Sequence, residues 1–376
     1  MRLLISAGGT GGHVYPALAP IEALRKLNPH LEIHWVGAVG GMEADLVRRA
    51  DIPYTPIHGA GVVGVGAFKA LIGIFRLAVG FLQAMGIVLR FRPHALFVTG
   101  GYTAVAVTIA CWLLRVPIAV YLPDVEPGSG VRFVARFASL VMVTLPDSRK
   151  YFTGKQVVVT GYPLRPEIIA ATQQSPQQAR AHFGLQPDKR TVFVFGGSRG
   201  ARSLNHAVLS HAESLVRQAG VQLLHISGTL DWEAVQKARQ ALPTDVQSAY
   251  FVTPYLHEDM GSAFAAADLV VARAGASTLG ELPAFALPAI LVPYPHAWRY
   301  QKVNADALAQ SGAAIVQPDE QLQANLFDLI DALVQEPTRL ATMRQAARSL
   351  AQPNAAERMA QALAGLMTAN SVGKKP

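Results

Sequence analysis

The chain has 376 residues, of which 51% are hydrophobic and 15% charged, a balance that supplies a large core and excludes a disordered protein. Its length exceeds that of one typical core and predicts two domains. The single cysteine, Cys111, excludes a disulfide framework and is typical of a reducing compartment.

Positive charge is concentrated in the first part of the chain. Residues 1–164 carry 15 Lys/Arg against 8 Asp/Glu, whereas residues 165–376 carry 18 against 17. No acidic residue occurs between Asp51 and Asp124. A basic half of this kind suits a nucleic acid or an anionic membrane surface. Because the basic residues do not cluster with aromatic ones and their surroundings are very apolar, we predict an anionic membrane surface as partner and no nucleic acid.

The chain begins with an apolar run that is too short for a signal peptide, and we interpret residues 3–6 as the first strand. A glycine-rich turn, 8–12, and an amphipathic helix to about Leu27 follow. Such a turn lets backbone N–H groups approach a phosphate. Its spacing is not GxGxxG, and no clear acidic residue ends the second strand, 33–37, which disfavours a hydride-transfer enzyme. His13 lies where the helix opens, and we predict a catalytic or ligand-contacting role for it rather than one in capping or packing.

The segment 60–91 is very apolar. Four of its polar residues are spaced by seven and share one stripe of a helix: Lys69, Arg76, Gln83 and Arg90. The longest charge-free piece, 77–89, has 13 residues and is shorter than the roughly 20 needed to span a bilayer. We predict an interfacial helix, with Leu77, Phe81 and Leu82 as candidates for its outer face. A core helix with a polar stripe fits most of the segment equally well.

Residues 95–114 form an uncharged run of 20 residues that Gly100 and Gly101 interrupt. A strand, a glycine turn and a helix explain it better than a membrane span. The loop 122–130 contains the acidic residues Asp124 and Glu126. The segment 161–167 contains two prolines and is the predicted interdomain connector. We predict further strands at residues 117–121, 140–144 and 157–160.

The second half begins with a strand at 191–195 and a glycine-rich turn, 196–205, that opens a helix. Arg199 and Arg202 add positive charge suited to a diphosphate. Strands and helices alternate regularly from here to the last helices, at about 337–367, and this alternation predicts doubly wound parallel sheets in both halves. We predict the strands of this half at residues 223–226, 250–253, 269–272, 290–292 and 314–316.

The stretch 273–305 contains most of the candidate donor-binding residues. After a buried strand, Gly275 and Ala276 allow a close turn, and Ser277 or Thr278 can cap the helix that begins there. Helix starts suit phosphate, and Glu281 is placed to accept hydrogen bonds from the vicinal hydroxyls of a sugar. Four later side chains are candidates for reading sugar hydroxyls: His296, Arg299, Gln301 and Asn304. An ordinary βαβ unit with a capped helix fits this stretch equally well.

Two Rossmann-like domains with glycine loops facing a cleft describe the GT-B glycosyltransferase fold. The motifs GGTGGHVYPALA, GGY, GYPLR, GGSRGARSLN and RAGASTLGE, then LVPYPHA with Gln301 and Asn304, resemble in order and spacing the MurG family over essentially the whole chain. Its members are UDP-N-acetylglucosamine:N-acetylmuramyl-(pentapeptide) pyrophosphoryl-undecaprenol N-acetylglucosamine transferases. The resemblance implies inverting transfer of GlcNAc from UDP-GlcNAc onto lipid I (undecaprenyl-diphospho-MurNAc-pentapeptide), giving lipid II for peptidoglycan synthesis.

The resemblance also implies a division of labour. Residues 1–164 would form the acceptor-binding, membrane-facing domain, and a helix at about 345–368 would pack back on it. Residues 165–344 would bind UDP-GlcNAc. The expected location is peripheral, on the cytoplasmic face of the cell membrane, where the acceptor is a polyprenyl-diphosphate lipid and proteins of cell-wall synthesis are candidate partners.

Site residues follow from the resemblance position by position. His13 is the candidate base, and the loops for the acceptor diphosphate contain Gly12, Gly100, Gly101 and Tyr102. One departure is that Tyr121-Leu122-Pro123-Asp124 replaces a His-Glu-Gln-Asn stretch, so that Asp124 stands where an asparagine is expected to touch GlcNAc. The implied donor contacts are Thr10, Gly11, Gly12, Asp124, Arg165, Ser198, Leu256 (a backbone contact to uracil), Ala276, Ser277, Thr278, Leu279, Gly280, Glu281 and Gln301.

The expected chemistry needs a general base, and histidine fits this role near neutral pH. The helix near Ala276 and the amides around Ser198 would meet the charge of the departing UDP. No Asp-X-Asp pair occurs, so we predict no metal and no other cofactor. Three alternatives stay open: a glycolipid glycosyltransferase with another lipid acceptor, a UDP-GlcNAc 2-epimerase-like enzyme, and a membrane-docked nucleotide-sugar binding protein without catalysis. The presence of both His13 and Glu281 argues against the third.

Overall fold

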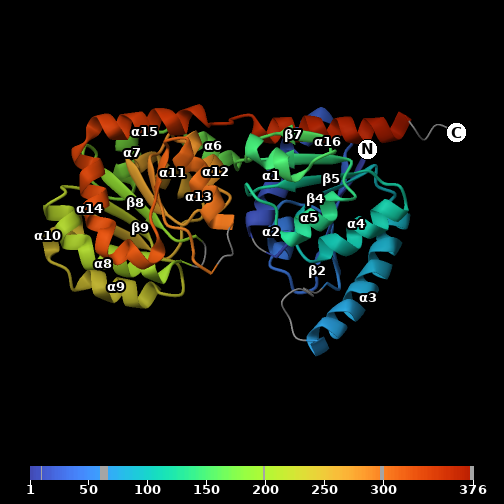
Figure 1. Ribbon diagram of the computed structural model, residues 1–376, viewed down its shortest axis with the longest axis horizontal. Helices are drawn as coiled ribbons and strands as arrows, with labels where there is room; N and C mark the ends of the chain where they lie inside the picture. The colour runs from blue at the N-terminus through green and yellow to red at the C-terminus, as the bar shows by residue number, and fades with distance from the viewer. Residues whose placement is uncertain (10, 60–66, 198–199, 297–299, 373–376) are drawn as a thin grey trace. The chain divides into compact units, whose positions relative to one another are not determined.

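The computed structural model describes residues 1–9, 11–59, 67–197, 200–296 and 300–372. The predicted contacts Thr10 and Ser198, and the candidates Arg199 and Arg299, lie outside these ranges. The chain divides into two compact units, Met1–Leu164 with Asn354–Pro376, and Arg165–Pro353 (Figure 1). Each unit contains one parallel β-sheet covered by helices.

The first unit has a seven-stranded sheet in the order β3-β2-β1-β4-β5-β6-β7. Its strands are β1 (Arg2–Ala7), β2 (Glu32–Ala38), β3 (Tyr54–Ile57), β4 (Ala95–Gly100), β5 (Ile118–Leu122), β6 (Leu140–Val143) and β7 (Val157–Val159). Its helices are α1 (Gly11–Leu27), α2 (Glu43–Arg49), α3 (Ala67–Phe91), α4 (Thr103–Leu113), α5 (Ser129–Ala135), the 3₁₀ helix η1 (Pro146–Tyr151) and α16 (Ala355–Val372).

The central strands of this sheet are apolar along their whole length because helices cover both faces. One face packs against α3, α4 and α5, and the other against α1 and α16. Met359, Leu363 and Met367 of α16 are fully buried, and α16 packs on α1 (Figure 1). This helix begins at Ala355 rather than near residue 345, because Pro337–Ser349 forms a separate helix of the second unit.

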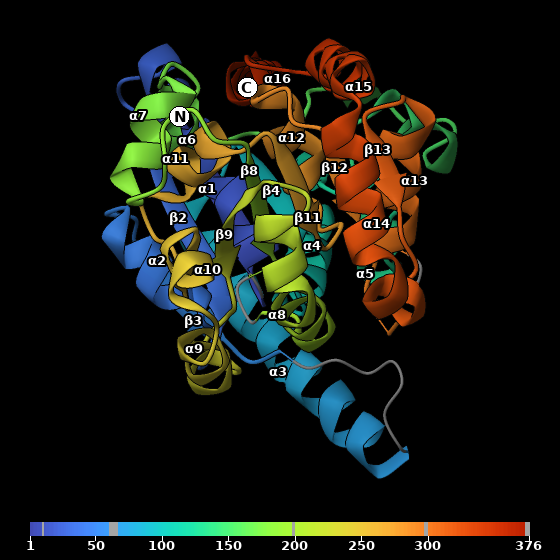
Figure 2. The same cartoon turned by 90° about the vertical axis from the view of Figure 1, so that its left-hand side faces the viewer.

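Two further details differ from the sequence prediction. The edge strand β3 was not predicted, since its short sequence, Tyr-Thr-Pro-Ile, contains a proline that only an edge strand accommodates easily. The helix α3 has 25 residues, and its first half extends beyond the sheet of its own unit (Figures 1 and 2). Among the described residues, no helix combines the length and apolar character needed to cross a membrane.

The second unit has a six-stranded sheet in the order β10-β9-β8-β11-β12-β13. Its strands are β8 (Thr191–Phe195), β9 (Gln222–Ile226), β10 (Tyr250–Thr253), β11 (Leu269–Ala272), β12 (Ala289–Leu291) and β13 (Ala314–Val316). Its helices are α6 (Pro166–Ala171), α7 (Pro176–His182), α8 (Arg202–Arg217), α9 (Trp232–Gln240), α10 (Thr244–Ser248), α11 (Met260–Ala266), α12 (Thr278–Ala284), α13 (Tyr300–Gln310), the 3₁₀ helix η2 (Asp319–Gln321), α14 (Leu322–Gln335) and α15 (Pro337–Ser349).

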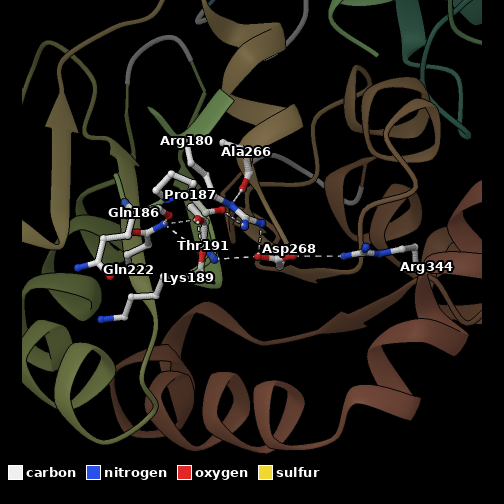
Figure 3. A network of polar contacts seen from close by, with 9 residues as sticks. All are labelled: Arg180, Gln186, Pro187, Lys189, Thr191, Gln222, Ala266, Asp268 and Arg344. Carbon is white, nitrogen blue, oxygen red and sulfur yellow. Dashed lines mark hydrogen bonds and ion pairs between the residues drawn. The ribbon is translucent and has the colours of Figure 1, made fainter. Parts of the chain in front are cut away.

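A buried ion pair connects four segments of this unit (Figure 3). Arg180 of α7 is 6% exposed and donates to Asp268 Oδ2 at 2.8 Å and to the carbonyl oxygens of Ala266 and Pro187 at 3.0 and 2.7 Å. Asp268 Oδ2 also accepts from the Thr191 N–H at 2.9 Å, and its Oδ1 lies 3.6 Å from Arg344 of α15. Because these charges are paired and hydrogen-bonded, their burial is tolerated, and removing one partner would leave the other exposed to an apolar interior.

Substituting Asp268→Asn should therefore lower the free energy of unfolding by about 1–3 kcal/mol, since the neutral amide removes the negative charge that pairs with the buried Arg180 guanidinium. Denaturant-induced unfolding, followed by a spectroscopic signal of the second unit, measures this change in free energy. The control is Asp245→Asn, which affects an exposed pair with Arg217 at 2.8 Å and should leave stability unchanged within error. Equal stability of the two variants would contradict a stabilising role of the Arg180–Asp268 ion pair.

Candidate active site

The two glycine turns of the first unit lie side by side because they follow adjacent parallel strands, β1 and β4. The Gly8 N–H donates to the Gly100 carbonyl at 3.3 Å. Gly101 has a φ of +106°, and a Cβ atom there would lie 3.0 Å from both the backbone nitrogen and oxygen of Gly8. Only glycine therefore allows this approach, which brings both turns to the carboxyl edge of the sheet, where ligands of α/β folds bind.

His13, in the first turn of α1, lies against this pair of turns. A Cβ atom on Gly100 would come within 2.7 Å of Cε1 and Nδ1 of the imidazole. The Thr99 hydroxyl donates to the His13 carbonyl at 2.6 Å and fixes the backbone of the residue. The Nδ1 atom is buried and has no hydrogen-bond partner among the described residues. The geometry thus supplies an imidazole with one nitrogen uncommitted.

The charge state of His13 is set by opposing effects. Burial lowers the pKa of the imidazole, whereas the nearby Asp124 carboxylate and a hydrogen bond with the Thr99 backbone raise it, with a net lowering. His13 is therefore neutral at pH 7, the form that can accept a proton. Asp124 itself is half-buried in the loop after β5. This loop is held by the Thr144 hydroxyl, which donates to the Pro123 carbonyl at 2.8 Å, and by the Ser148 hydroxyl, which donates to the Val125 carbonyl at 2.8 Å.

Two further predicted residues of the first unit lie in or next to the two glycine turns. Gly12 is exposed, and Tyr102, at the start of α4, is 66% exposed beside the second glycine turn. The second acid of the loop, Glu126, is buried and pairs with Arg132 at 2.9 Å. The loop therefore brings one carboxylate toward His13 and uses the other internally.

Not every amide of the first glycine turn is available to a ligand. The Gly8 N–H bonds to Gly100, and the Gly9 N–H donates to the carboxylate of Glu43 at 3.4 Å. Because the first N–H groups of a helix have no partner within it, the amides of Gly11 and Gly12 are the ones that suit a phosphate. Within the predicted phosphate-binding turn, the amides suited to a phosphate are therefore those at the start of α1. Sequence reasoning missed Glu43, although it is an acid placed two residues after a glycine pair, Gly40-Gly41.

In the second unit, the helix start that follows β11 is built differently from the prediction. Ser277 precedes α12 but does not cap it through its side chain, and the Thr278 hydroxyl donates to the Gly275 carbonyl at 2.6 Å. The prediction that a side chain of Ser277 or Thr278 caps this helix was therefore wrong. Thr278 and Leu279 are 1% and 3% exposed, so their side chains are not available to a ligand. The more accessible residues of this turn are Ala276, Ser277, Gly280 and Glu281.

Glu281 interacts with Arg165 and Ser277. Burial raises the pKa of its carboxyl, while a hydrogen bond with Ser277 and the charge of Arg165 act in the opposite direction. Arg165 lies at the start of α6 and also pairs with Glu167 at 3.0 Å. Three of the predicted donor contacts thus form one cluster with an acceptor, a hydroxyl and a cation.

A cavity of about 780 Å³ lies at the carboxyl edge of the same sheet and contains Gln301. Gln301 Oε1 accepts from the Tyr294 N–H at 2.8 Å, and His296 is exposed beside it. Asn304, in contrast, is fully buried and donates to the Ala274 carbonyl at 3.1 Å, so our prediction that it reads sugar hydroxyls was wrong. The cavity is lined by Gly196, Gly197, Gly200, Ala201, Arg202, Ser203, Leu230, Asp231, Arg273, Tyr294, Pro295, His296, Gln301 and Asp319.

Arg273 is a wall residue of this cavity that sequence reasoning did not single out. It is 8% exposed, pairs with Asp319, donates to the Ser203 hydroxyl at 2.8 Å and lies 5.3 Å from the centre of the Tyr294 ring. Its position directly after the buried strand β11 was the available signal. The predicted uracil contact, Leu256, is half-exposed in the loop after β10 and does not line the cavity.

Comparisons with known proteins identify the family. Residues 3–143 match the glycosyltransferase family 28 N-terminal domain, and residues 191–359 match the glycosyltransferase family 28 C-terminal domain. A UDP-N-acetylglucosamine--N-acetylmuramyl-(pentapeptide) pyrophosphoryl-undecaprenol N-acetylglucosamine transferase of Moorella thermoacetica is 39% identical, over 96% of this chain and 98% of the relative. The Bacillus subtilis protein of the same name is 33% identical, over 96% and 98%. The chain belongs to the MurG family.

Solved structures agree with this assignment. The crystal structure of Acinetobacter baumannii MurG has a TM-score of 0.77 and 27% identity, covering 97% of this chain and 99% of that one. The Staphylococcus aureus MnaA–UDP structure has a TM-score of 0.71 at 14% identity, over 100% and 99%, and shows a shared fold alone. The predicted GT-B class, with two Rossmann-like parallel-sheet domains, is confirmed, and the chain is a glycosyltransferase. Within its described residues, no three His, Cys, Asp or Glu side chains gather as a metal site.

Substituting Glu281→Ala should weaken the binding of UDP-GlcNAc by roughly 1–3 kcal/mol, because Ser277 and Arg165 lose their acceptor and the sugar hydroxyls lose theirs. Isothermal titration calorimetry measures the change, and Glu233→Ala on the exposed face of α9 is the matched control. Unchanged affinity in a folded Glu281→Ala protein would remove this carboxylate from the donor site.

Proposed function

We propose that the enzyme transfers GlcNAc from UDP-GlcNAc to lipid I and produces lipid II for peptidoglycan synthesis. The observation that carries the proposal is the sequence similarity, over nearly the full length, to relatives named for this reaction, together with a neutral imidazole between two glycine turns. The acceptor diphosphate would bind the amides at the start of α1, and UDP-GlcNAc would bind the residues around Glu281 and Gln301.

The chemistry follows from these groups. A hydroxyl oxygen of the acceptor attacks the anomeric carbon of GlcNAc from the face opposite UDP, and the bond from that carbon to the diphosphate oxygen breaks. His13 takes the hydroxyl proton as the new glycosidic bond forms. Backbone amides donate hydrogen bonds to the leaving diphosphate and stabilise its negative charge without a change in protonation. Inversion at the anomeric carbon is the consequence of this single displacement.

Incubation with UDP-GlcNAc labelled in the sugar, and with a lipid I analogue, tests the proposal. The label should move into the lipid product with release of UDP, and His13→Ala should lower turnover by about a hundredfold or more while the affinity for UDP-GlcNAc is kept. Transfer to a diacylglycerol but not to lipid I would assign a glycolipid glycosyltransferase. Conversion of UDP-GlcNAc to its 2-epimer without an acceptor would assign an epimerase.

The pair formed by His13 and Asp124 predicts a pH profile. Since the pKa of His13 lies below its usual 6.5, kcat/KM should hold through neutral pH and fall only as the pH drops through that lowered value. Asp124→Asn removes the larger of the two effects that raise the pKa of His13, so the acidic limb should move to still lower pH. The profile of kcat/KM against pH measures the midpoint, with exposed Asp147→Asn as control. An acidic limb that stays in place or moves upward would exclude Asp124 as the electrostatic partner of His13.

We also propose that α3 docks the first unit on an anionic membrane surface. Phe75, Leu82 and Leu89 are spaced by seven along α3 and are 70%, 68% and 55% exposed. Arg76 and Arg90 follow two of them directly and are exposed, so that cations flank the apolar stripe. Trp112 and Leu113, at the end of the neighbouring α4, add half-exposed apolar area. Apolar side chains entering the interface and cations meeting head groups act together in such binding.

This surface differs in part from the predicted one. Phe81 is only half-exposed and packs against the core of the unit, and Leu77 is also half-exposed, which leaves Leu82 as the shared member. Gln83, on the predicted polar stripe, accepts from the His58 N–H at 2.9 Å and so serves the protein itself. The inward and outward faces of α3 alternate at helical spacing, and the sequence alone did not distinguish them.

The triple substitution Phe75→Ser, Leu82→Ser and Leu89→Ser should release the protein from liposomes that contain anionic lipid, since the apolar contact is lost while the fold is kept. Sedimentation with liposomes measures binding, which for the native protein should weaken at 1 M salt, where the Debye length is about 3 Å. Leu230→Ser, at an exposed leucine of the second unit, is the control. Retained binding by a folded triple variant would place the docking surface elsewhere.

A further inference from the structure

Glu43 is a fully buried carboxylate directly beneath the first glycine turn. It is the first residue of α2 and is 0% exposed. Its Oε1 accepts from the Ala38 N–H at 2.7 Å, and its Oε2 accepts from the Gly9 N–H at 3.4 Å. One side chain thus joins the end of β2 to the turn after β1, which in turn leads into α1.

Three glycines enclose this carboxylate. A Cβ atom on Gly8 would lie 2.6 Å from Oε1, and one on Gly37 would lie 2.8 Å from it. A Cβ atom on Gly41 would overlap both carboxylate oxygens. The three glycines come from the turn after β1, from β2 and from the loop that precedes α2, so the absence of three side chains creates a cradle for one charged group.

Tyr54 completes the surroundings. Its hydroxyl donates to the Ala38 carbonyl at 2.9 Å, and its pKa is raised by burial first and then by the charge of Glu43. The carboxylate therefore has a tyrosine hydroxyl on one side and backbone amides on the other. A buried charge costs free energy unless such groups surround it, and here they come from two strands, β2 and β3, and from the glycine turn.

We propose that Glu43 is a positioning residue for glycosyl transfer, acting by holding the Gly9 N–H and thereby the turn that carries the first amides of α1 and His13. This inference rests on the proposed function. Gly9 has a φ of +92°, a conformation that the bond to Glu43 maintains. With the Gly9 amide turned inward to a carboxylate, a diphosphate is directed to the amides of Gly11 and Gly12. His13, four residues after Gly9, is placed by the same constraint.

The substitution Glu43→Gln tests the inference. The amide oxygen can still accept from the Ala38 N–H, but the new NH₂ group faces the Gly9 N–H, donor against donor. We expect kcat to fall by about tenfold or more and the KM for the lipid I analogue to rise, while the Kd for UDP-GlcNAc, which the proposed function assigns to the second unit, stays within about twofold. Asp45→Asn, an exposed carboxylate on the same helix, should change none of these values.

A second variant and a second readout make the test decisive. Gly41→Ala leaves the carboxylate but pushes it with a Cβ atom, and should lower kcat in the same direction. Hydrogen exchange of a peptide covering residues 3–15 should be faster in both variants and unchanged in Asp45→Asn, whether or not the protein transfers GlcNAc. Inactive native protein would therefore overturn the proposed function, whereas exchange would still report on the role of Glu43.

Several results would overturn the inference. Native kcat and native exchange in folded Glu43→Gln would show that the turn does not depend on the carboxylate. An equal loss of kcat and of UDP-GlcNAc affinity would indicate general destabilisation rather than positioning. Failure of both Glu43→Gln and Gly41→Ala to fold would show that the carboxylate serves the fold and not the placement of His13.

Discussion

The close approach of backbone to backbone at the carboxyl edge of the first sheet is the constraint on which the candidate site depends. Gly8, Gly100 and Gly101 are held at distances that leave no space for a Cβ atom, and the imidazole of His13 occupies the space that Gly100 leaves open. Parallel strands β1 and β4 end beside each other, so the fold delivers both turns to one place. Without glycine at these positions, the helix start and the base could not share that place.

Burial of a titratable group has a different consequence in each unit. Burial keeps His13 neutral, and Asp124 moderates the effect, so that the imidazole is a base at pH 7. At Glu281, burial raises the pKa of the carboxyl, and Ser277 and Arg165 oppose this change. Desolvation favours the uncharged form in both cases, but it produces a proton acceptor in one unit and a carboxyl held by partners in the other. Burial therefore sets the direction of the pKa shift at both groups, and the partners reduce it.

The sequence predicted much of the fold because buried parallel strands are continuous apolar runs between glycine turns, as at Leu269–Ala272. It failed where the deciding contact is distant in sequence. Glu43 meets Gly9 across 34 residues, and Arg273 meets Asp319 across 46. The edge strand β3 was hidden by its proline. The cap expected from Ser277 or Thr278 does not form, since Ser277 makes no capping bond and the Thr278 hydroxyl donates to the Gly275 carbonyl. Spacing along one element is legible in a sequence, whereas the partners of a buried charge are not.

The fold by itself does not separate a transferase from an epimerase, since a UDP-GlcNAc 2-epimerase from Neisseria meningitidis shares it with a TM-score of 0.69 at 12% identity. The difference must lie in the groups placed at the sheet edges. A transferase that acts on a lipid diphosphate needs a base that stays neutral beside this anionic group. The diphosphate and Asp124 would both favour protonation of His13, and burial of the ring opposes it. Asp124 adds negative charge at this point, so the amides at the start of α1 have more to offset. Because Glu43 accepts the Gly9 N–H, the amides of Gly11 and Gly12 are the ones placed to offset this charge.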